Sequence, residues 1–347
     1  MMAGIIGYGV YIPQNRIRTE DIANVWGRDS MSIKNGLLIN EKSVPSIDED
    51  TVTMGIEAAN NAIKRARINP KEIGAIYAGS ETPAYAVKPN ISMIGNAIGL
   101  GNSHAGADVE FACKAGTAAM QIIMGMVDSG MVKYGLAIGA DTGECNAENI
   151  ADQSSSAAGA AFILGSNKKE MVAEIIQTAS YTSDIPDFWR RPYERYPMHG
   201  ERFTAEPAYF HHTISATKML MEKTKIKVSD IDHVAFHTPN GKFPTRVAKM
   251  LGFTAEQLKA GFVVDKIGNP YSAASLVGLA TILDTAKPGE KILLTSFGSG
   301  AGSDSFYINV TDGIDDKRNL ARNTKYYLDT KRYIDYTTYC KYTDRIQ

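Results

Sequence analysis

The pattern of hydrophobic and polar positions along the chain predicts two successive runs of strands and helices. Short apolar stretches predict strands over residues 4–12, 74–78, 134–140, 158–164, 171–177 and 234–236. Apolar residues at helical spacing predict helices over 50–66, 90–98 and 214–225, and a small-residue run predicts another that ends near 131. Such an alternation is typical of an α/β fold.

An internal repeat relates the two runs. A helix–turn–strand unit recurs at a constant offset of 158 positions, which matches Ile68, Glu72, Ile73 and Ile76 with Ile226, Asp230, Ile231 and Val234. The repeat predicts two similar α/β halves that pack against each other, with a ligand site at their junction. The expected ranges are 1–168 for the first half, 169–312 for the second, and 313–347 for a charged, tyrosine-rich tail.

The segment VEFACKAGTAAM, residues 109–120, places Cys113 between a strand-like run and a helix of small residues. A helix N-terminus lowers the pKa of a thiol and can hold a developing oxyanion, so this position suits a nucleophile. The alternative is a buried cysteine that only fills space, which is the commoner role of an isolated free cysteine.

The two halves each supply a pair of polar residues with the same spacing. Glu81 precedes Cys113 by 32 positions, and His237 precedes Asn269 by 32 positions. A thiol beside an imidazole is typical of acyl transfer, and a desolvated Glu81 would have a raised pKa suited to general acid–base catalysis. The alternatives are a solvated carboxylate, a structural histidine and an asparagine that only serves a turn.

Further residues are candidates for binding. The glycine-rich segment 296–303, around Ser299, can offer backbone N–H groups to an oxyanion, and its spacing does not fit a dinucleotide-binding loop. Lys242 and Arg246 lie one helical turn apart and can bind a phosphate, although a solvated helix face explains them equally well.

Composition limits the classes of partner. Lys plus Arg number 37 against 38 for Asp plus Glu, so no overall charge attracts nucleic acid or a membrane. Three scattered cysteines predict neither a disulfide framework nor a metal site, and they indicate a reducing, cytoplasmic setting. The N-terminal segment lacks the features of a signal peptide, and no apolar run is long enough to span a membrane.

Several motifs together resemble the thiolase superfamily and, within it, the hydroxymethylglutaryl-CoA synthase family. GSETP resembles its general acid/base segment, EFACKAGTAA its nucleophile segment, FHTPNGK its histidine segment, and GNPYSAAS and FGSGAGS its two late loops. The match runs in order over about residues 1–312, and the lack of large insertions resembles the archaeal branch. It implies a thiolase-like α/β fold with five αβαβα layers. Lys114 departs from the family, which often has an aromatic residue there.

The resemblance implies a reaction as well as a fold. Cys113 would take an acetyl group from acetyl-CoA, with the oxyanion held by backbone N–H groups of Cys113 and the Ser299 loop. Glu81 would remove a methyl proton as that carbon attacks acetoacetyl-CoA, and His237 would polarise or protonate the ketone oxygen. Asn269 would orient the second thioester, water would release 3-hydroxy-3-methylglutaryl-CoA, and the product would feed mevalonate and isoprenoid synthesis.

The resemblance also implies further contacts and partners. The acyl pocket would include Ser154, Thr204 and, as a weaker match, Asp29, and CoA would be bound by Lys242, Arg246 and Arg202. No cofactor is expected, because the CoA thioesters are substrates. The family implies a homodimer, and its archaeal branch an association with an acetoacetyl-CoA thiolase and a small zinc-ribbon/OB-fold accessory protein.

Three questions stay open at the level of sequence. A ketoacyl-ACP synthase III-like enzyme would share Cys113, His237 and Asn269 but would not use Glu81. A non-catalytic acyl-CoA-binding subunit of a thiolase assembly would need no reactive thiol. The tail has tyrosines at every third position from Tyr333 to Tyr342, which indicates either a docked helix or a solvated segment.

Overall fold

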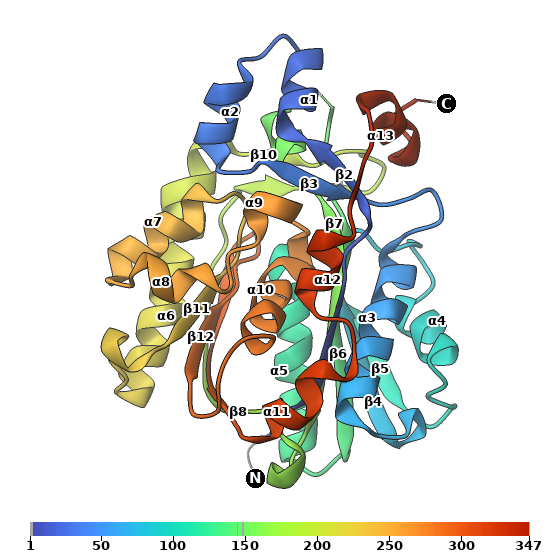
Figure 1. Ribbon diagram of the computed structural model, residues 1–347, viewed down its shortest axis with the longest axis vertical. Coiled ribbons are helices and arrows are strands. Elements are labelled where there is room, and N and C mark those ends of the chain that lie inside the picture. The colour runs from blue at the N-terminus through green and yellow to red at the C-terminus, as the bar shows by residue number, and fades with distance from the viewer. Residues whose placement is uncertain (1–2, 144, 148, 347) are drawn as a thin grey trace.

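The structure is a computed structural model that describes residues 3–143, 145–147 and 149–346 (Figure 1). The strands are β1 (Gly4–Tyr11), β2 (Asn15–Arg18), β3 (Glu41–Val44), β4 (Ile73–Gly79), β5 (Ala105–Val109), β6 (Tyr134–Thr142), β7 (Ala157–Gly165), β8 (Ala173–Thr182), β9 (Phe188–Trp189), β10 (Met198–His199), β11 (His233–Phe236), β12 (Lys291–Thr295), β13 (Gly302–Val310) and β14 (Arg332–Tyr333). The α-helices are α1 (Thr19–Val25), α2 (Ser30–Leu37), α3 (Thr51–Ala66), α4 (Asn90–Ala97), α5 (Ala115–Asp128), α6 (His211–Thr224), α7 (Lys242–Leu251), α8 (Ala255–Lys259), α9 (Val264–Ile267), α10 (Ala274–Leu283), α11 (Gly313–Lys317), α12 (Thr324–Asp329) and α13 (Tyr336–Tyr342). Every strand and helix predicted from the hydrophobic pattern is present, with its ends shifted by a few residues.

The strand order repeats itself, which confirms the prediction of two similar halves. In the first half β1, β7, β6 and β4 are neighbours in that order, with antiparallel, antiparallel and parallel pairing. In the second half β8, β13, β12 and β11 follow with the same three pairings. The halves join where β1 pairs with β8 through Gly4 and Ile5, opposite Glu174 and Ala173.

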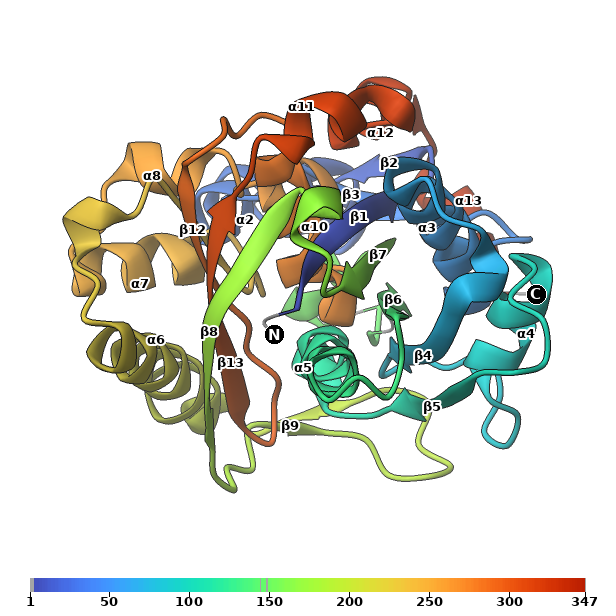
Figure 2. The ribbon, with the colours of Figure 1, turned by 90° about the horizontal axis from the view of Figure 1, so that it is seen from below.

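The helices complete a five-layer arrangement, as the fold prediction required. Helix α3 packs on β1 and β7, and α5 covers β6 and β4. Helix α10 contacts α5 and strands of both halves, and α6 covers β8 and β13 on the outside. Viewed from below, α5 and α10 lie between the two halves of the sheet (Figure 2). Strand ends of both halves therefore approach one another beside this central helical layer.

The repeat has a physical basis in the turns that precede β4 and β11. The backbone N–H of Asn69 donates to the Glu72 side chain at 3.3 Å, and that of Lys227 donates to the Asp230 side chain at 2.9 Å. Both turns lead directly into a buried strand. The acidic positions detected in the repeat are therefore equivalent turn caps.

Small residues let the nucleophile helix approach its neighbours closely. A Cβ atom on Gly79, at the end of β4, would lie 2.2 Å from the carbonyl carbon of Ala115. A Cβ atom on Gly116 would lie 2.7 Å from the carbonyl oxygen of Ser272. Larger residues at these positions would push the start of α5 away from both halves.

The tail after β13 docks on the body of the protein. Strand β14 pairs in parallel with β2, and the side chain of Tyr339 on α13 is buried beside Ile17 and Ile22. The periodic tyrosines do not share one helix face, because Tyr333 belongs to β14 and α13 begins at Tyr336. The predicted boundary between the two halves, at residues 168 and 169, lies in a turn between β7 and β8. The predicted first half begins at residue 1 and the predicted tail ends at residue 347, and both of these ends lie outside the described residues.

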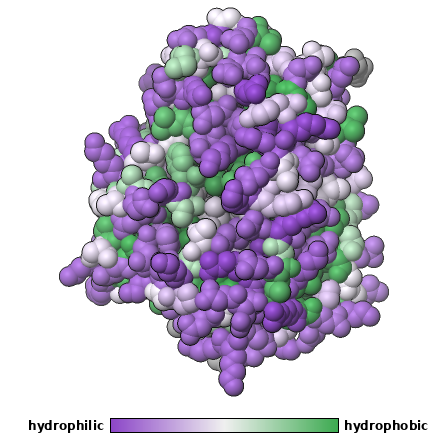
Figure 3. Space-filling model, in the orientation of Figure 1, coloured by the Kyte–Doolittle hydropathy of each residue, from purple (hydrophilic) through white to green (hydrophobic). Residues whose placement is uncertain are grey.

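The visible face of the molecule is mainly hydrophilic, with scattered hydrophobic residues (Figure 3). Over the described ranges, no helix is both long and apolar enough to cross a membrane.

Candidate active site

Cys113 lies in a short 3₁₀ turn, Ala112–Lys114, that joins β5 to α5. This is the strand-to-helix position predicted from the sequence. The preceding residue, Ala112, has a φ of 42°, in the left-handed region that L-residues adopt at a cost. Its counterpart before α10, Tyr271, has a φ of 48°. Both halves thus use a strained turn at the junction, and the first of them holds the thiol there.

The thiol of Cys113 donates a hydrogen bond to Oε1 of Glu81 at 2.9 Å. Burial, together with the nearby carboxylate of Asp141, raises the pKa of Glu81 to about 8. Burial also raises the pKa of the Cys113 thiol well above its usual value, and the adjacent Glu81 carboxylate adds to the effect. The expected rise at Glu81 is confirmed, whereas the expected lowering at Cys113 is wrong, because desolvation and a neighbouring anion outweigh the helix terminus.

Asp141, at the end of β6, fixes the turn that carries Glu81. Its Oδ1 accepts hydrogen bonds from the Ser80 hydroxyl at 2.7 Å and from the backbone N–H groups of Glu81 and Thr82 at 2.9 and 3.0 Å. Its Oδ2 accepts one from the backbone N–H of Ser272 at 2.8 Å, in the second half. Asp141 therefore connects the Glu81 turn to the turn that begins α10. No role was predicted for Asp141, although it directly follows the strand predicted over residues 134–140.

We expect Asp141→Asn to lower the free energy of unfolding by about 2–4 kcal/mol, because an amide cannot accept all of these hydrogen bonds. Urea denaturation followed by circular dichroism measures the change. Ser80→Ala is the matched control and should cost only about 1 kcal/mol, since it removes one donor. Equal stability of Asp141→Asn and the wild type would contradict this role.

His237 follows the last residue of β11, as predicted, and its side chain is buried. Burial among Tyr209 and Phe297 lowers the pKa of the imidazole to about 3, so the ring is neutral at physiological pH. Its Nδ1 has no hydrogen-bond partner among the described residues. The Tyr209 hydroxyl donates to the backbone oxygen of His237 at 2.6 Å. A neutral imidazole held in this way can donate a hydrogen bond to a developing oxyanion.

The candidate residues from both halves meet at a cavity of about 500 Å³. Its lining includes the predicted residues Cys113, His237, Asn269, Ser154, Thr204 and Ser299. The side-chain oxygen of Asn269 accepts a hydrogen bond from the backbone N–H of Tyr271 at 3.0 Å, which fixes the amide at the cavity wall. The topology thus brings together residues that lie more than 180 positions apart in the sequence.

A second hollow, of about 1090 Å³, adjoins this cavity. Glu81 lines this hollow, together with Phe111 and Trp189. The two hollows share Phe188, Tyr271 and Ser299 as lining residues. The contact between Cys113 and Glu81 therefore connects the cavity to the second hollow.

Lys114 lies beside the nucleophile but does not line the cavity. Its Nζ lies 3.0 Å from Oδ2 of Asp304, and it lies over the ring of Phe111. Thr117 donates to the same carboxylate oxygen at 2.9 Å. The departure from the family at this position is accommodated by a buried ion pair, so the acyl pocket does not contain the lysine.

The remaining predicted residues lie outside the cavity lining. Asp29 accepts a hydrogen bond from the backbone N–H of Met31 and thereby caps α2, so the structure gives it a structural contact only. Lys242 is the exposed first residue of α7, next to the lining residue Phe243. Arg246 is also exposed; it pairs with Glu206 and lies over the ring of Phe210. Arg202 is exposed as well.

Two residues that sequence reasoning missed complete the site. Tyr209 supports His237, and the Tyr271 hydroxyl shares a hydrogen bond with the Ser155 hydroxyl at 2.9 Å. Tyr271 belongs to the GNPYSAAS segment, so its place in that motif was the available signal. The part of the chain that the structure describes holds no cluster of His, Cys, Asp and Glu suited to a metal ion.

Comparison with known proteins identifies close relatives along the whole chain. The chain is 58% identical over 314 residues to the hydroxymethylglutaryl-CoA synthase of Archaeoglobus fulgidus, covering 90% of this chain and 91% of that protein. It is 54% identical over 346 residues to the enzyme of the same name from Methanocaldococcus jannaschii, covering 100% of both. Residues 221–310 match the family of 3-oxoacyl-[acyl-carrier-protein] synthase III C-terminal domains.

Solved structures share the fold at lower identity. A hydroxymethylglutaryl-CoA synthase complexed with CoA superimposes with a TM-score of 0.88 at 21% identity, covering 98% of this chain and 90% of that one. The 3-oxoacyl-(acyl carrier protein) synthase III of Pseudomonas aeruginosa gives a TM-score of 0.82 at 15% identity, covering 90% of this chain and 99% of that one. Both comparisons confirm the thiolase-like fold.

Proposed function

The chain belongs to the hydroxymethylglutaryl-CoA synthase family, and from this premise we propose that it condenses acetyl-CoA with acetoacetyl-CoA and water to give 3-hydroxy-3-methylglutaryl-CoA and CoA. It is accordingly an acyl-transferring condensing enzyme. One observation carries the proposal. The 2.9 Å contact between the Cys113 thiol and the Glu81 carboxyl group joins a nucleophile to a general acid–base group at a cavity that also contains His237.

The first step is acetyl transfer to Cys113. The Sγ atom attacks the thioester carbonyl of acetyl-CoA, the carbon–sulfur bond to CoA breaks, and the thiol proton ends on the departing CoA thiolate. Because the pKa of the thiol is raised, the proton must leave as the bond forms, and Glu81 is the acceptor in hydrogen-bond contact. Backbone N–H groups at Cys113 and the Ser299 loop stabilise the oxyanion.

The second step forms the carbon–carbon bond. The Glu81 carboxylate removes a proton from the methyl group of the acetyl-cysteine, and that carbon attacks the ketone of acetoacetyl-CoA. The neutral His237 polarises the ketone oxygen by a hydrogen bond, and the new alkoxide takes back the proton that Glu81 removed. Asn269 orients the thioester of the second substrate. Water then cleaves the bond to Cys113, which releases the product and restores the thiol.

The cationic side chains near the cavity bind the CoA portion of each substrate in this proposal. Lys242 and Arg246 lie on α7. Only Gly241 separates the start of this helix from Asn240, which lines the cavity. Arg246 must then exchange its partner Glu206 for a phosphate. Arg202 is a further basic residue in the segment that leads to the lining residue Thr204.

We assign the chain to a homodimer and to the cytoplasm as part of the same proposal. Strand β5 is the last strand on one side of the main sheet, and most of its residues are exposed, so a second copy can pair with its free edge. The three cysteines of the chain form no disulfide, which suits a reducing compartment. An association with an acetoacetyl-CoA thiolase and a zinc-ribbon/OB-fold accessory protein is proposed on the family resemblance alone.

Mass spectrometry and product analysis test the proposed function. The purified chain incubated with acetyl-CoA should carry one acetyl group on the peptide that contains Cys113. Addition of acetoacetyl-CoA should discharge this adduct and yield 3-hydroxy-3-methylglutaryl-CoA. Absence of the adduct would favour a non-catalytic acyl-CoA-binding subunit, whereas an adduct that reacts only with a malonyl-carrier substrate would favour a ketoacyl synthase.

A further inference from the structure

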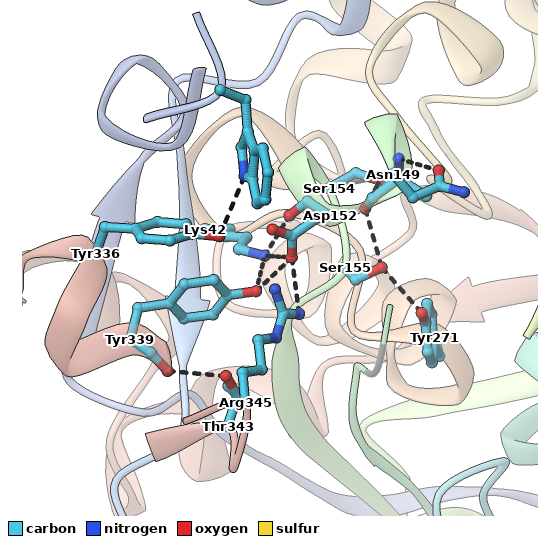
Figure 4. A network of polar contacts seen from close by, with 12 residues as sticks. Lys42, Asn149, Asp152, Ser154, Ser155, Tyr271, Tyr336, Tyr339, Thr343 and Arg345 are labelled. Atoms are coloured by element: carbon cyan, nitrogen blue, oxygen red, sulfur yellow. Dashed lines mark hydrogen bonds and ion pairs between the residues drawn. The ribbon is translucent and has the colours of Figure 1, made fainter. Parts of the chain in front are cut away.

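A buried charge cluster joins the carboxy-terminal segment to the body of the protein (Figure 4). Its centre is Asp152, whose Oδ1 lies 3.1 Å from Nζ of Lys42 on β3 and 2.9 Å from the Arg345 guanidinium. The Tyr339 hydroxyl donates to the same oxygen and accepts a hydrogen bond from Lys42 at 2.8 Å. The side chains of Asp152 and Lys42 are fully buried, and that of Arg345 is 5% exposed.

The charges in this cluster depend on one another. Burial alone would raise the pKa of Asp152, but Lys42 and Arg345 more than offset it, so the pKa lies below its usual value. The Lys42 ammonium lies over the Tyr339 ring at 4.5 Å, and the Arg345 guanidinium at 4.6 Å. A buried carboxylate depends on its hydrogen-bond donors, because removal of one donor leaves part of the cost of taking the carboxylate out of water uncompensated.

The same short segment that carries Asp152 forms a wall of the cavity. Asp152 belongs to the 3₁₀ turn Ile150–Gln153, and the lining residues include Ala151, Ser154 and Ser155. The hydroxyl groups of Ser154 and Ser155 donate to the backbone oxygen of Ala151 at 3.1 and 3.0 Å. Asp152 is directed to the tail and Ser155 to Tyr271, as Figure 4 shows.

This wall is also connected to the segment that carries Asn269. The backbone N–H of Asn269 donates to the oxygen of Ser154 at 2.7 Å, and the N–H of Ser156 donates to the oxygen of Asn269 at 3.0 Å. The Ser155 and Tyr271 hydroxyls add a side-chain link at 2.9 Å. A displacement of the wall would therefore be transmitted to Asn269.

We infer that the carboxy-terminal segment 332–345 positions the cavity wall 150–156, with Tyr339 and Arg345 acting through Asp152. These two tail residues are positioning residues, since they contact neither Cys113 nor the cavity. Other contacts hold the tail in register: the Trp26 indole N–H donates to the Tyr336 hydroxyl at 3.1 Å, and β14 pairs with β2. The tail is thus a component of the site, although it lies outside the two repeated halves.

The expected effect of the tail residues on catalysis rests on the proposed function. Because the wall is bonded to Asn269, which is proposed to orient the second substrate, a shifted wall should impair acetoacetyl-CoA binding more than acetylation of Cys113. For Tyr339→Phe and Arg345→Met we expect the KM for acetoacetyl-CoA to rise about five- to tenfold, with the rate of acetylation changed less than about twofold. Arg345→Lys, which keeps the charge, should recover part of the loss.

Amide hydrogen exchange gives a readout that does not depend on activity. In the full-length Tyr339→Phe and Arg345→Met variants, peptides covering 150–156 should exchange faster than in the wild type, while peptides from β4 and β6 should be unchanged. Lys341→Met and Tyr342→Phe are matched controls, because these neighbours on α13 lie outside the Asp152 cluster. Both controls should keep the wild-type exchange and KM.

Two results would overturn the inference. One is faster exchange in α13 with unchanged exchange in 150–156, which would mean that the wall does not depend on the tail. The other is an equal loss of protection throughout the protein together with a lower melting temperature, which would mean a general structural role. If the wild type itself formed no acetyl adduct, the proposed function would fail, and the exchange data would still decide the position of the wall.

Discussion

Cys113→Ser is expected to abolish the acetyl adduct and to lower turnover by at least about 10³-fold. A serine hydroxyl has a far higher pKa than a thiol, and the site is built for a proton to pass from sulfur to a carboxylate already in contact. The expected measurements are intact-mass spectrometry after exposure to acetyl-CoA and a steady-state assay with both substrates. The fold should be retained, because the substitution changes one atom in a residue that makes a single side-chain hydrogen bond to Glu81.

Cys145→Ser is the matched control for this experiment. Cys145 is also a buried, unpaired thiol, and burial raises its pKa to about 11, but it does not line the cavity. Its serine variant should acetylate at the wild-type rate. An adduct that survives in Cys113→Ser, or one that disappears in Cys145→Ser, would place the nucleophile elsewhere.

Glu81→Gln is expected to separate the two chemical steps. Acetylation should persist within about tenfold of the wild-type rate, because removal of the carboxylate lowers the pKa of the thiol while it removes the proton acceptor. Condensation should fall by about 10³-fold, since the amide cannot take the methyl proton. Rapid-quench measurement of the adduct and of product formation distinguishes the steps. Unimpaired condensation would contradict the role given to Glu81.

The raised pKa of Glu81 also predicts the pH dependence. Because burial raises the pKa of Glu81 to about 8, the carboxylate that takes the methyl proton becomes scarcer as the pH falls below that value, so the rate of condensation by the acetylated enzyme should fall with it. Stability should change in the opposite direction, because a carboxyl group with a raised pKa favours the folded state when protonated. The gain in melting temperature of Glu81→Gln over the wild type should therefore be absent near pH 4, grow as the pH rises and be complete above about pH 8.

The parts of the site that depend on local pattern were predictable from the sequence. Glu81 and His237 follow strands that are recognisable in the sequence as apolar runs. The turn caps Glu72 and Asp230 mark the repeat. The equal 32-residue spacing of Glu81–Cys113 and His237–Asn269 does not reflect equivalent positions in the two halves. The turns before α5 and α10 correspond at an offset of 159, since Ala112 and Tyr271 have the positive φ values.

What the sequence did not reveal depends on contacts between distant residues. The pKa of Cys113 is raised because β4 brings Glu81 against it, and no helix-terminus argument contains that contact. Asp141 and Tyr209 act through hydrogen bonds to the other half or to distant backbone. Lys114 could not be oriented without knowledge of its partner Asp304. The docking of the tail likewise depends on Lys42 and Asp152, far away in the chain.

The Asp152 cluster has a consequence for how the protein is made. Arg345 is synthesised 193 residues after Asp152, and Tyr339 is synthesised 297 residues after Lys42. Both halves of the sheet can leave the ribosome and begin to fold while Asp152 still lacks Arg345 and Lys42 still lacks Tyr339. The contacts of the tail with Asp152 can form only after residues 339–345 have been synthesised. A chain that stops before residue 339 would hold the nucleophile but would lack the contacts of Tyr339 and Arg345 with Asp152.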